Sequence, residues 1–259
     1  MALVATPAVV LHAFDYLESS RILRLATREA GVLSVLARGA RRSRNRFGVL
    51  DLFCEGTAQL HTKPGRDLQT LSAFEIARAR PELAADIGRF TGAAAIAELM
   101  LRFARDDAQP SLYDAMVTAL DAIADAPPER SRETTLAGAW RLVALLGFAP
   151  SLDRCGSCDA DVGTAEAATF SHPAGGTLCP RCARLHPGGR VLPRAARDAV
   201  RGWANGAGAP ELEDAAAKAH QRLLREFLSE HVTDGKALRA FQVWERGAWA
   251  AAAAAGGSG

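Results

Sequence analysis

The sequence lacks three features that would each have indicated a particular class of protein. It contains no unbroken apolar run of about 18 residues, so nothing in it predicts a membrane-spanning helix. Its first ten residues place no basic residue ahead of their short apolar stretch, and so they do not resemble a secretory signal. Neither of the common glycine-rich motifs that cradle phosphates is present. We therefore expect a cytoplasmic protein with no membrane partner.

Net charge is also small, at +2, but its distribution is uneven. Residues 1–80 contain twelve Lys and Arg against seven Asp and Glu, a local net charge of +5, which leaves −3 for the remaining residues. The N-terminal part is thus the one expected to bind anionic partners. At 259 residues the chain exceeds the usual length of a single domain, so we expect two domains.

Residues 1–80 have the pattern of a small β domain. Short apolar stretches at residues 9–11, 21–27, 32–36, 49–61 and 68–74 predict five strands. The segment Lys63-Pro64-Gly65-Arg66 has Pro and Gly where a type II turn requires them. Five short strands separated by turns indicate a small barrel or sandwich, and an OB-type barrel is the natural candidate. Periodicity by itself does not distinguish an OB barrel from an SH3-like one.

The pattern becomes helical after Pro81. Apolar residues recur at helical spacing over residues 82–105, 112–123, 136–146 and 211–232. A turn-rich segment with four cysteines, at about residues 151–190, interrupts the helices, and residues 250–259 form a low-complexity tail. We therefore predict an α+β multidomain chain: an OB-type domain at residues 1–80 and a helical domain at 81–249 that contains a zinc ribbon.

The strongest local motif is a pair of Cys-x-x-Cys turns separated by twenty residues, formed by Cys155, Cys158, Cys179 and Cys182. This spacing is typical of a four-cysteine zinc ribbon, in which two turns close a tetrahedron of thiolates around the metal. Four sulfur ligands leave no position for water, so the predicted zinc site is structural. Free buried thiols or a disulfide pair are the alternatives, and a cytoplasmic location disfavours the disulfide. The fifth cysteine, Cys54, has no partner in the pattern.

A zinc deaminase also uses paired cysteines, but its motif is incomplete in this chain. That chemistry requires a His-x-Glu element and a proline directly before the second cysteine pair. Here His172 is followed by Pro173 and Ala174, and Pro180 lies inside the pair. The pattern therefore does not support this enzyme activity, and we expect a protein without catalytic residues.

A second motif is a cluster of five arginines within nine positions: Arg38, Arg41, Arg42, Arg44 and Arg46. The cluster follows a predicted strand and lacks apolar periodicity, so it predicts an exposed loop that binds phosphates through guanidinium groups. A solvated basic loop without a ligand is the alternative. Of the nearby aromatic residues Phe14, Tyr16, Phe47 and Phe53, we expect most in the core. Binding through phosphates with little sequence preference is the resulting prediction.

Four segments together resemble the RecO family. They are residues 10–21 (VLHAFDYLESSR), 25–31 (LATREAG), 36–42 (LARGARR) and, in the cysteine segment, 170–182 (FSHPAGGTLCPRC). The similarity runs in order from about residue 8 to about residue 240 and so covers nearly the whole chain.

The resemblance implies a DNA-binding recombination mediator that is not an enzyme. It implies binding of single- and double-stranded DNA, annealing of complementary strands, and a nucleoid-associated location. It also implies partnership with RecR, contact with the acidic C-terminal tail of the single-stranded-DNA-binding protein SSB, and help in loading RecA. The five arginines would contact DNA and the four paired cysteines would bind structural zinc. A general OB and zinc-ribbon nucleic-acid binder, for example one associated with RNA, and a DNA-processing enzyme are the alternatives.

Overall fold

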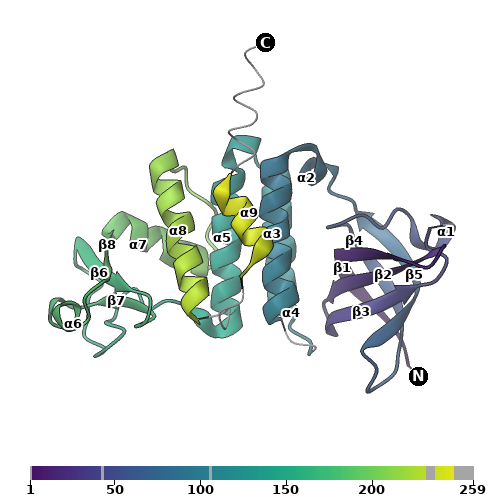
Figure 1. Cartoon of the computed structure of the whole chain (residues 1–259), viewed down its shortest axis with the longest axis horizontal. Coiled ribbons are helices and arrows are strands. Elements are labelled where there is room, and N and C mark those ends of the chain that lie inside the picture. Colours follow the sequence, from purple (N-terminus) through teal and green to yellow (C-terminus); the bar gives the residue numbers. More distant parts are fainter. Residues whose placement is uncertain (1, 42–43, 105–106, 232–236, 248–259) are drawn as a thin grey trace, which may run out of the picture. The chain divides into compact units, whose positions relative to one another are not determined.

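Five strands form an OB-like barrel in the computed structural model of this chain (Figure 1). They are β1 (Ala2–Tyr16), β2 (Ser20–Thr27), β3 (Gly31–Ala37), β4 (Glu55–Thr62) and β5 (Leu68–Arg78). Strand β1 pairs antiparallel with both β2 and β4, whereas β3 pairs parallel with β5. The order β1-β2-β3-β5-β4 returns to β1 and closes the barrel. The predicted fold of residues 1–80 is therefore confirmed.

The structure describes residues 2–41, 44–104, 107–231 and 237–247, and the predicted tail at 250–259 lies outside these ranges. The chain divides into two units, residues 1–126 and 127–259, which are considered separately below. Within the described ranges, no helix combines the length and the apolar character that a membrane span requires.

The turn predicted between β4 and β5 is present, and Gly65 has the positive φ, 74°, that such a turn needs. The expected strand at residues 49–61 is wrong in its first half, because β4 begins only at Glu55. Residues 38–54 instead form a long β3–β4 loop that contains the short helix α1 (Arg44–Phe47). Phe47 and Phe53 of this loop are buried, at 0% and 2% exposure. Phe47 packs in the barrel core with Leu50 and Cys54, whereas Phe53 packs against Phe90, with ring centroids 5.7 Å apart.

A β-bulge in β1 decides which side chains the barrel shows to solvent. Val10 is opposite Leu25 but His12 is opposite Arg24, so Leu11 is an extra residue in the pairing with β2. Before the bulge, Val10 points into the core. After it, the even-numbered residues of β1 lie on the outer face while Ala13 packs against the core.

The barrel is followed in the same unit by α2 (Pro81–Ala85), α3 (Ile87–Phe103) and α4 (Pro110–Asp125). The side chain of Asp86 caps α3 by accepting a 2.8 Å hydrogen bond from the backbone N–H of Arg89. Arg28 donates two hydrogen bonds to Asp114 on α4, at 2.9 and 3.0 Å, and this contact lowers the pKa of the carboxyl. The turn after β2 is thereby joined to α4.

Arg80 connects the end of the barrel with these helices. Its side chain is fully buried, and its guanidinium donates hydrogen bonds to the carbonyl of Phe53 at 2.9 Å, to Glu55 at 2.6 Å and to Asp121 at 2.6 Å. The three partners come from the β3–β4 loop, from β4 and from α4. The residue is also held at φ 53°, a left-handed conformation that non-glycine residues rarely adopt. The fold tolerates this backbone conformation because each of the three guanidinium nitrogens of Arg80 donates a hydrogen bond.

The second unit is a helical layer with an inserted ribbon. Its helices are α5 (Ser131–Val143), which continues through a π turn to Phe148, then α7 (Arg194–Ala204), α8 (Asp214–His231) and α9 (Arg239–Arg246). A short 3-10 turn, Pro128–Arg130, precedes them. Trp140 and Phe227 meet in the core with ring centroids 5.4 Å apart. The sequence pattern missed α7 and α9, which are short and rich in arginine.

The ribbon lies between α5 and α7 in the chain. Its strands β6 (Ala167–Ser171), β7 (Gly176–Leu178) and β8 (Arg190–Pro193) pair in the order β7-β6-β8, and the short helix α6 (Pro180–Leu185) follows β7. Phe170 of β6 lies 6.2 Å from Phe227 of α8, centroid to centroid. The predicted insertion of a ribbon into a helical domain is thus confirmed.

We predict that Arg80→Ala lowers the free energy of unfolding by about 2–4 kcal/mol, because it leaves the Phe53 carbonyl and the largely buried carboxylates of Glu55 and Asp121 without their partner. Arg78→Gln is the matched control: Arg78 also pairs with Asp121 but its side chain is 40% exposed, so about 1 kcal/mol or less is expected. Urea unfolding of the two variants measures the difference. Equal unfolding midpoints would contradict the role given to Arg80.

Candidate metal centre and nucleic-acid interface

The four paired cysteines meet at one point of the ribbon. Their sulfur atoms all lie within 4.8 Å of one another, and the sulfurs of Cys158 and Cys179 are 3.7 Å apart. A tetrahedral zinc site with Zn–S bonds of about 2.3 Å places neighbouring sulfurs about 3.8 Å apart. The donor set and its spacing therefore fit a zinc ion. Among the residues that the structure describes, this is the group of His, Cys, Asp or Glu side chains arranged to hold a metal.

Two glycines allow the chain to bring the cysteines together. A Cβ atom on Gly156 would lie 2.4 Å from the carbonyl oxygen of Ala174, and one on Gly176 would lie 2.1 Å from that of Ser151. Both distances are shorter than any real contact, so larger residues would push the strands apart. The first turn is closed by hydrogen bonds from Cys155 N–H to the Ala160 carbonyl at 2.7 Å and from Gly156 N–H to the Thr177 carbonyl at 2.8 Å.

Backbone hydrogen bonds favour the thiolate form that binds metals. Burial is the largest influence on Cys155 and opposes its ionisation, but hydrogen bonds from the N–H groups of Cys179, Ser157 and Cys158 together lower its pKa to about 6. The pKa of Cys179 is lowered chiefly by a hydrogen bond from the N–H of Cys182, in the first turn of α6. At Cys158, by contrast, a hydrogen bond from the Ala160 N–H lowers the pKa, but hydrogen bonds with the side chains of Cys182, Cys155 and Cys179 outweigh it and raise the pKa to about 11. The thiolate form is therefore favoured at Cys155 and Cys179.

The core around the sulfurs is small, although Phe170 of β6 is fully buried near Phe227 of α8. Its cluster of buried residues is Cys155, Val162, Leu178, Cys179 and Cys182. Three of the five are cysteines, so thiol groups occupy the space where a small domain of this size would otherwise need large apolar side chains. Folding of the ribbon therefore depends on what the sulfurs bind.

The predicted arginine cluster is described only in part. Arg38 and Arg41 are exposed just after β3; Arg41 lies 3.9 Å from Asp15, and Arg38 forms no ion pair with any described residue. Arg46 donates a 2.8 Å hydrogen bond to the carbonyl of Ser72 and stacks over the ring of Phe47, so it fastens the loop to β5. Arg42 lies outside the described residues, and of Arg44 the structure describes the backbone, in α1, but not the side chain.

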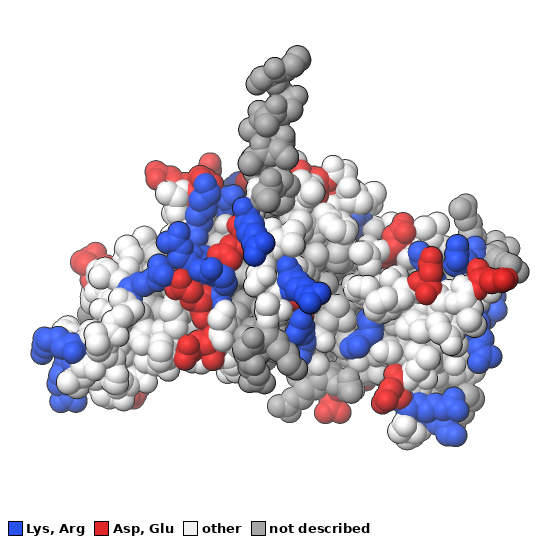
Figure 2. Space-filling view, viewed as in Figure 1, with Lys and Arg blue, Asp and Glu red and all other residues white. Residues whose placement is uncertain are grey.

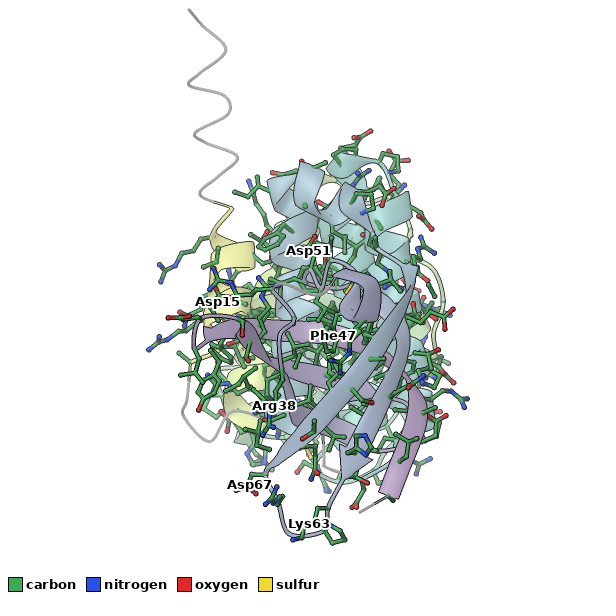
Figure 3. All side chains as sticks on the ribbon, turned by 90° about the vertical axis from the view of Figure 1, so that its right-hand side faces the viewer. Asp15, Arg38, Phe47, Asp51, Lys63 and Asp67 are labelled. Atoms are coloured by element: carbon green, nitrogen blue, oxygen red, sulfur yellow. The ribbon has the colours of Figure 1, made fainter. Side chains whose placement is uncertain are left out.

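A groove of about 560 Å³ runs over β2, β3 and the β4–β5 loop. Its basic residues are Arg24, Lys63 and Arg66, accompanied by Glu29 and Asp67. Figure 3 shows Lys63 and Asp67 on the loop that projects from one end of the barrel, with Arg38 labelled above it. Sequence analysis treated Lys63 and Arg66 only as turn residues, because nothing local to a turn shows that it borders a groove.

The expectation that the nearby aromatic residues belong mostly to the core is correct for Phe47 and Phe53 but wrong for Phe14 and Tyr16. These two are 50% and 42% exposed. The bulge at Leu11 turns them outward, where the ring of Phe14 stacks on His12 at 4.3 Å between centroids. The outer face of β1 and β2 therefore combines exposed rings with the guanidinium of Arg24, which is opposite His12.

Comparisons with known proteins match both halves of the chain. Residues 1–80 match the family described as Recombination protein O N terminal, and residues 84–239 match Recombination protein O C terminal. The DNA repair protein RecO of Anaeromyxobacter sp. (strain K) is 40% identical over 198 residues, which is 74% of this chain and 75% of the relative. The protein of the same name from Anaeromyxobacter dehalogenans (strain 2CP-C) is 41% identical over the same shares.

We predict that Cys179→Ser abolishes stoichiometric metal binding and unfolds the ribbon, because metal-binding energy in such sites, about 10–16 kcal/mol in zinc-finger peptides, is also folding energy. Metal content by mass spectrometry and thermal unfolding provide the measurement. Cys54→Ala is the control, since Cys54 is buried in the barrel core and should leave metal content unchanged. Full metal content and wild-type melting of Cys179→Ser would exclude a structural metal site.

Proposed function

This chain belongs to the RecO family of recombination and DNA repair proteins, and we propose that it is a non-enzymatic mediator that binds DNA through its barrel. It binds single- and double-stranded DNA, anneals complementary strands and, with RecR, helps RecA to load onto DNA coated with SSB. The observation that carries the proposal is the basic groove on an OB-like barrel, since barrels of this type bind oligonucleotides over strands 2 and 3 and the loop between strands 4 and 5.

The basic residues act on the phosphate backbone. Arg24, Lys63 and Arg66 in the groove, with the exposed Arg38 and Arg41 that follow β3, neutralise phosphates and release condensed counterions. These contacts carry no sequence information. Base pairing between the two strands supplies the specificity of annealing, while the protein lowers the repulsion that opposes their approach.

The exposed rings give the barrel a preference for unpaired bases. Stacking of a base on an aromatic side chain contributes about 1–3 kcal/mol and tolerates any base, because each has a π face. Phe14 and Tyr16 are exposed on the strand that pairs with β2, which contributes Arg24 to the groove. A single strand can therefore stack its bases while its phosphates contact the arginines.

The metal is a structural zinc ion bound by the four cysteines. Four sulfur ligands fill its coordination sphere and leave no position for a reactive water, which supports a role without catalysis. RecR, the SSB tail and RecA follow from family membership, as does activity in the cytoplasm at the nucleoid.

We predict that Lys63→Gln/Arg66→Gln slows the annealing of SSB-coated complementary oligonucleotides. Losing two phosphate contacts also makes the slope of log affinity against log salt shallower by about 1.4 for single-stranded DNA. Arg132→Gln/Lys218→Gln is the control with the same charge change, since both residues pair with Asp214. No annealing by the wild type, together with tighter binding of RNA, would favour a general RNA-associated binder instead.

A second variant separates stacking from charge. Phe14→Ala/Tyr16→Ala should weaken binding of single-stranded DNA by about 1–3 kcal/mol per lost stacking contact and affect duplex DNA much less. Leu3→Ala, a 65% exposed residue on the same strand, should leave both affinities unchanged. Fluorescence anisotropy with matched single- and double-stranded probes measures the effect, and equal losses on the two probes would argue against stacking.

A further inference from the structure

The charges of the ribbon are divided along its sequence. Residues 167–197 contain five arginines and no Asp or Glu, whereas the acidic residues of the ribbon, Asp153, Asp159, Asp161 and Glu166, all precede them. Most of those carboxylates have a partner: Asp153 pairs with Arg201 and Asp159 with Arg154 at 2.6 Å. The second half of the ribbon is therefore a basic segment with few unpaired carboxylates near it in the sequence.

Three of the five arginines are already used by the fold. Arg190 donates a 2.6 Å hydrogen bond to Glu226 of α8, and Arg194 lies within 4 Å of Glu166 and Asp198. Arg197 is fully buried and donates to the carbonyls of Val162 and Ala165. These three hold the ribbon against its own helices and are unavailable to a ligand.

Arg181 and Arg184 are the two arginines of this segment that the fold does not use. Both are exposed, and neither forms an ion pair or hydrogen bond with any described residue. They lie on one face of α6, three positions apart, where Cβ atoms are about 5–6 Å from each other. In Figure 2, Lys and Arg side chains gather at the end of the ribbon that carries α6, with no acidic side chain beside them on this face.

The metal site makes this pair rigid. Arg181 stands between the ligands Cys179 and Cys182, and Arg184 follows two residues after the second. A helix anchored at both ligands presents its guanidinium groups in a fixed arrangement, so less side-chain and backbone entropy is lost when they bind. Next to them Leu185 is 68% exposed, and a groove of about 500 Å³ begins at Leu185 and His186.

We infer that α6 of the ribbon is a second nucleic-acid contact, in which Arg181 and Arg184 bind phosphates of a DNA strand. Guanidinium groups bind phosphate oxygens bidentately, which fits a free arginine pair with no carboxylate to satisfy it. The groove is lined mostly by Gly, Pro, Ser and Ala and offers no deep apolar pocket for an anchoring side chain, which disfavours a protein partner. Each of the two units then carries its own DNA surface, so one chain contacts two strands at once. This inference rests on the proposed function.

The test is the full-length variant Arg181→Gln/Arg184→Gln. Its salt slope for single-stranded DNA should be shallower than that of the wild type by about 1.4, and annealing should slow. Arg154→Gln/Arg194→Gln is the matched control, since it removes the same charge from the ribbon and from the residue directly after it, but from arginines that pair with carboxylates. The control should bind and anneal like the wild type.

Three results would overturn the inference. An unchanged salt slope, or an equal change in the control, would show that these arginines do not contact DNA specifically. Loss of zinc from the variant would show that they serve the metal site. Unchanged DNA affinity with lost binding of poly-glutamate would assign the surface to an acidic protein. In each case DNA binding by the wild type keeps the proposed function intact, whereas its absence removes that function itself.

Discussion

One buried charge holds together the unit that carries the basic groove. Arg80 satisfies the Phe53 carbonyl, Glu55 and Asp121 at once, and no water replaces a missing partner in a fully buried position. Its contact with Phe53 also clamps the far end of the β3–β4 loop, the segment on which the arginine cluster lies. The geometry of the proposed DNA-binding face therefore depends on a buried residue that is not part of that face.

The ribbon is stabilised in a different way. The buried cluster around its sulfurs has three cysteines and only two apolar residues, Val162 and Leu178, so hydrophobic burial stabilises this part of the ribbon little. A metal ion bound by the four cysteines would supply the missing energy and would also fix the direction of α6. Stability and presentation of side chains are thus coupled, since the ligands Cys179 and Cys182 belong to the same turn of helix that displays the free arginines.

The two surfaces of the molecule differ in kind. On the barrel, exposed rings lie beside guanidinium groups, an arrangement that favours unpaired bases with their phosphates. On the ribbon, Arg181 and Arg184 are exposed, and in our inference they contact only the phosphate backbone, whether or not the bases are paired. The proposed annealing would use both surfaces, because one strand must keep its bases available while the phosphates of a second strand are bound.

Much of this protein's structure follows directly from local features of its sequence. The cysteine spacing predicts the metal ligands because two close turns suffice to bring four thiolates together, and the alternation of apolar residues predicts the five strands. Tertiary structure alone decided that Arg80 is buried, that Arg46 is tied to Ser72, and that Phe14 and Tyr16 face outward. The physical reason is register: one extra residue in β1 reverses the face of every residue after it, and only pairing with the neighbouring strand shows where that residue lies.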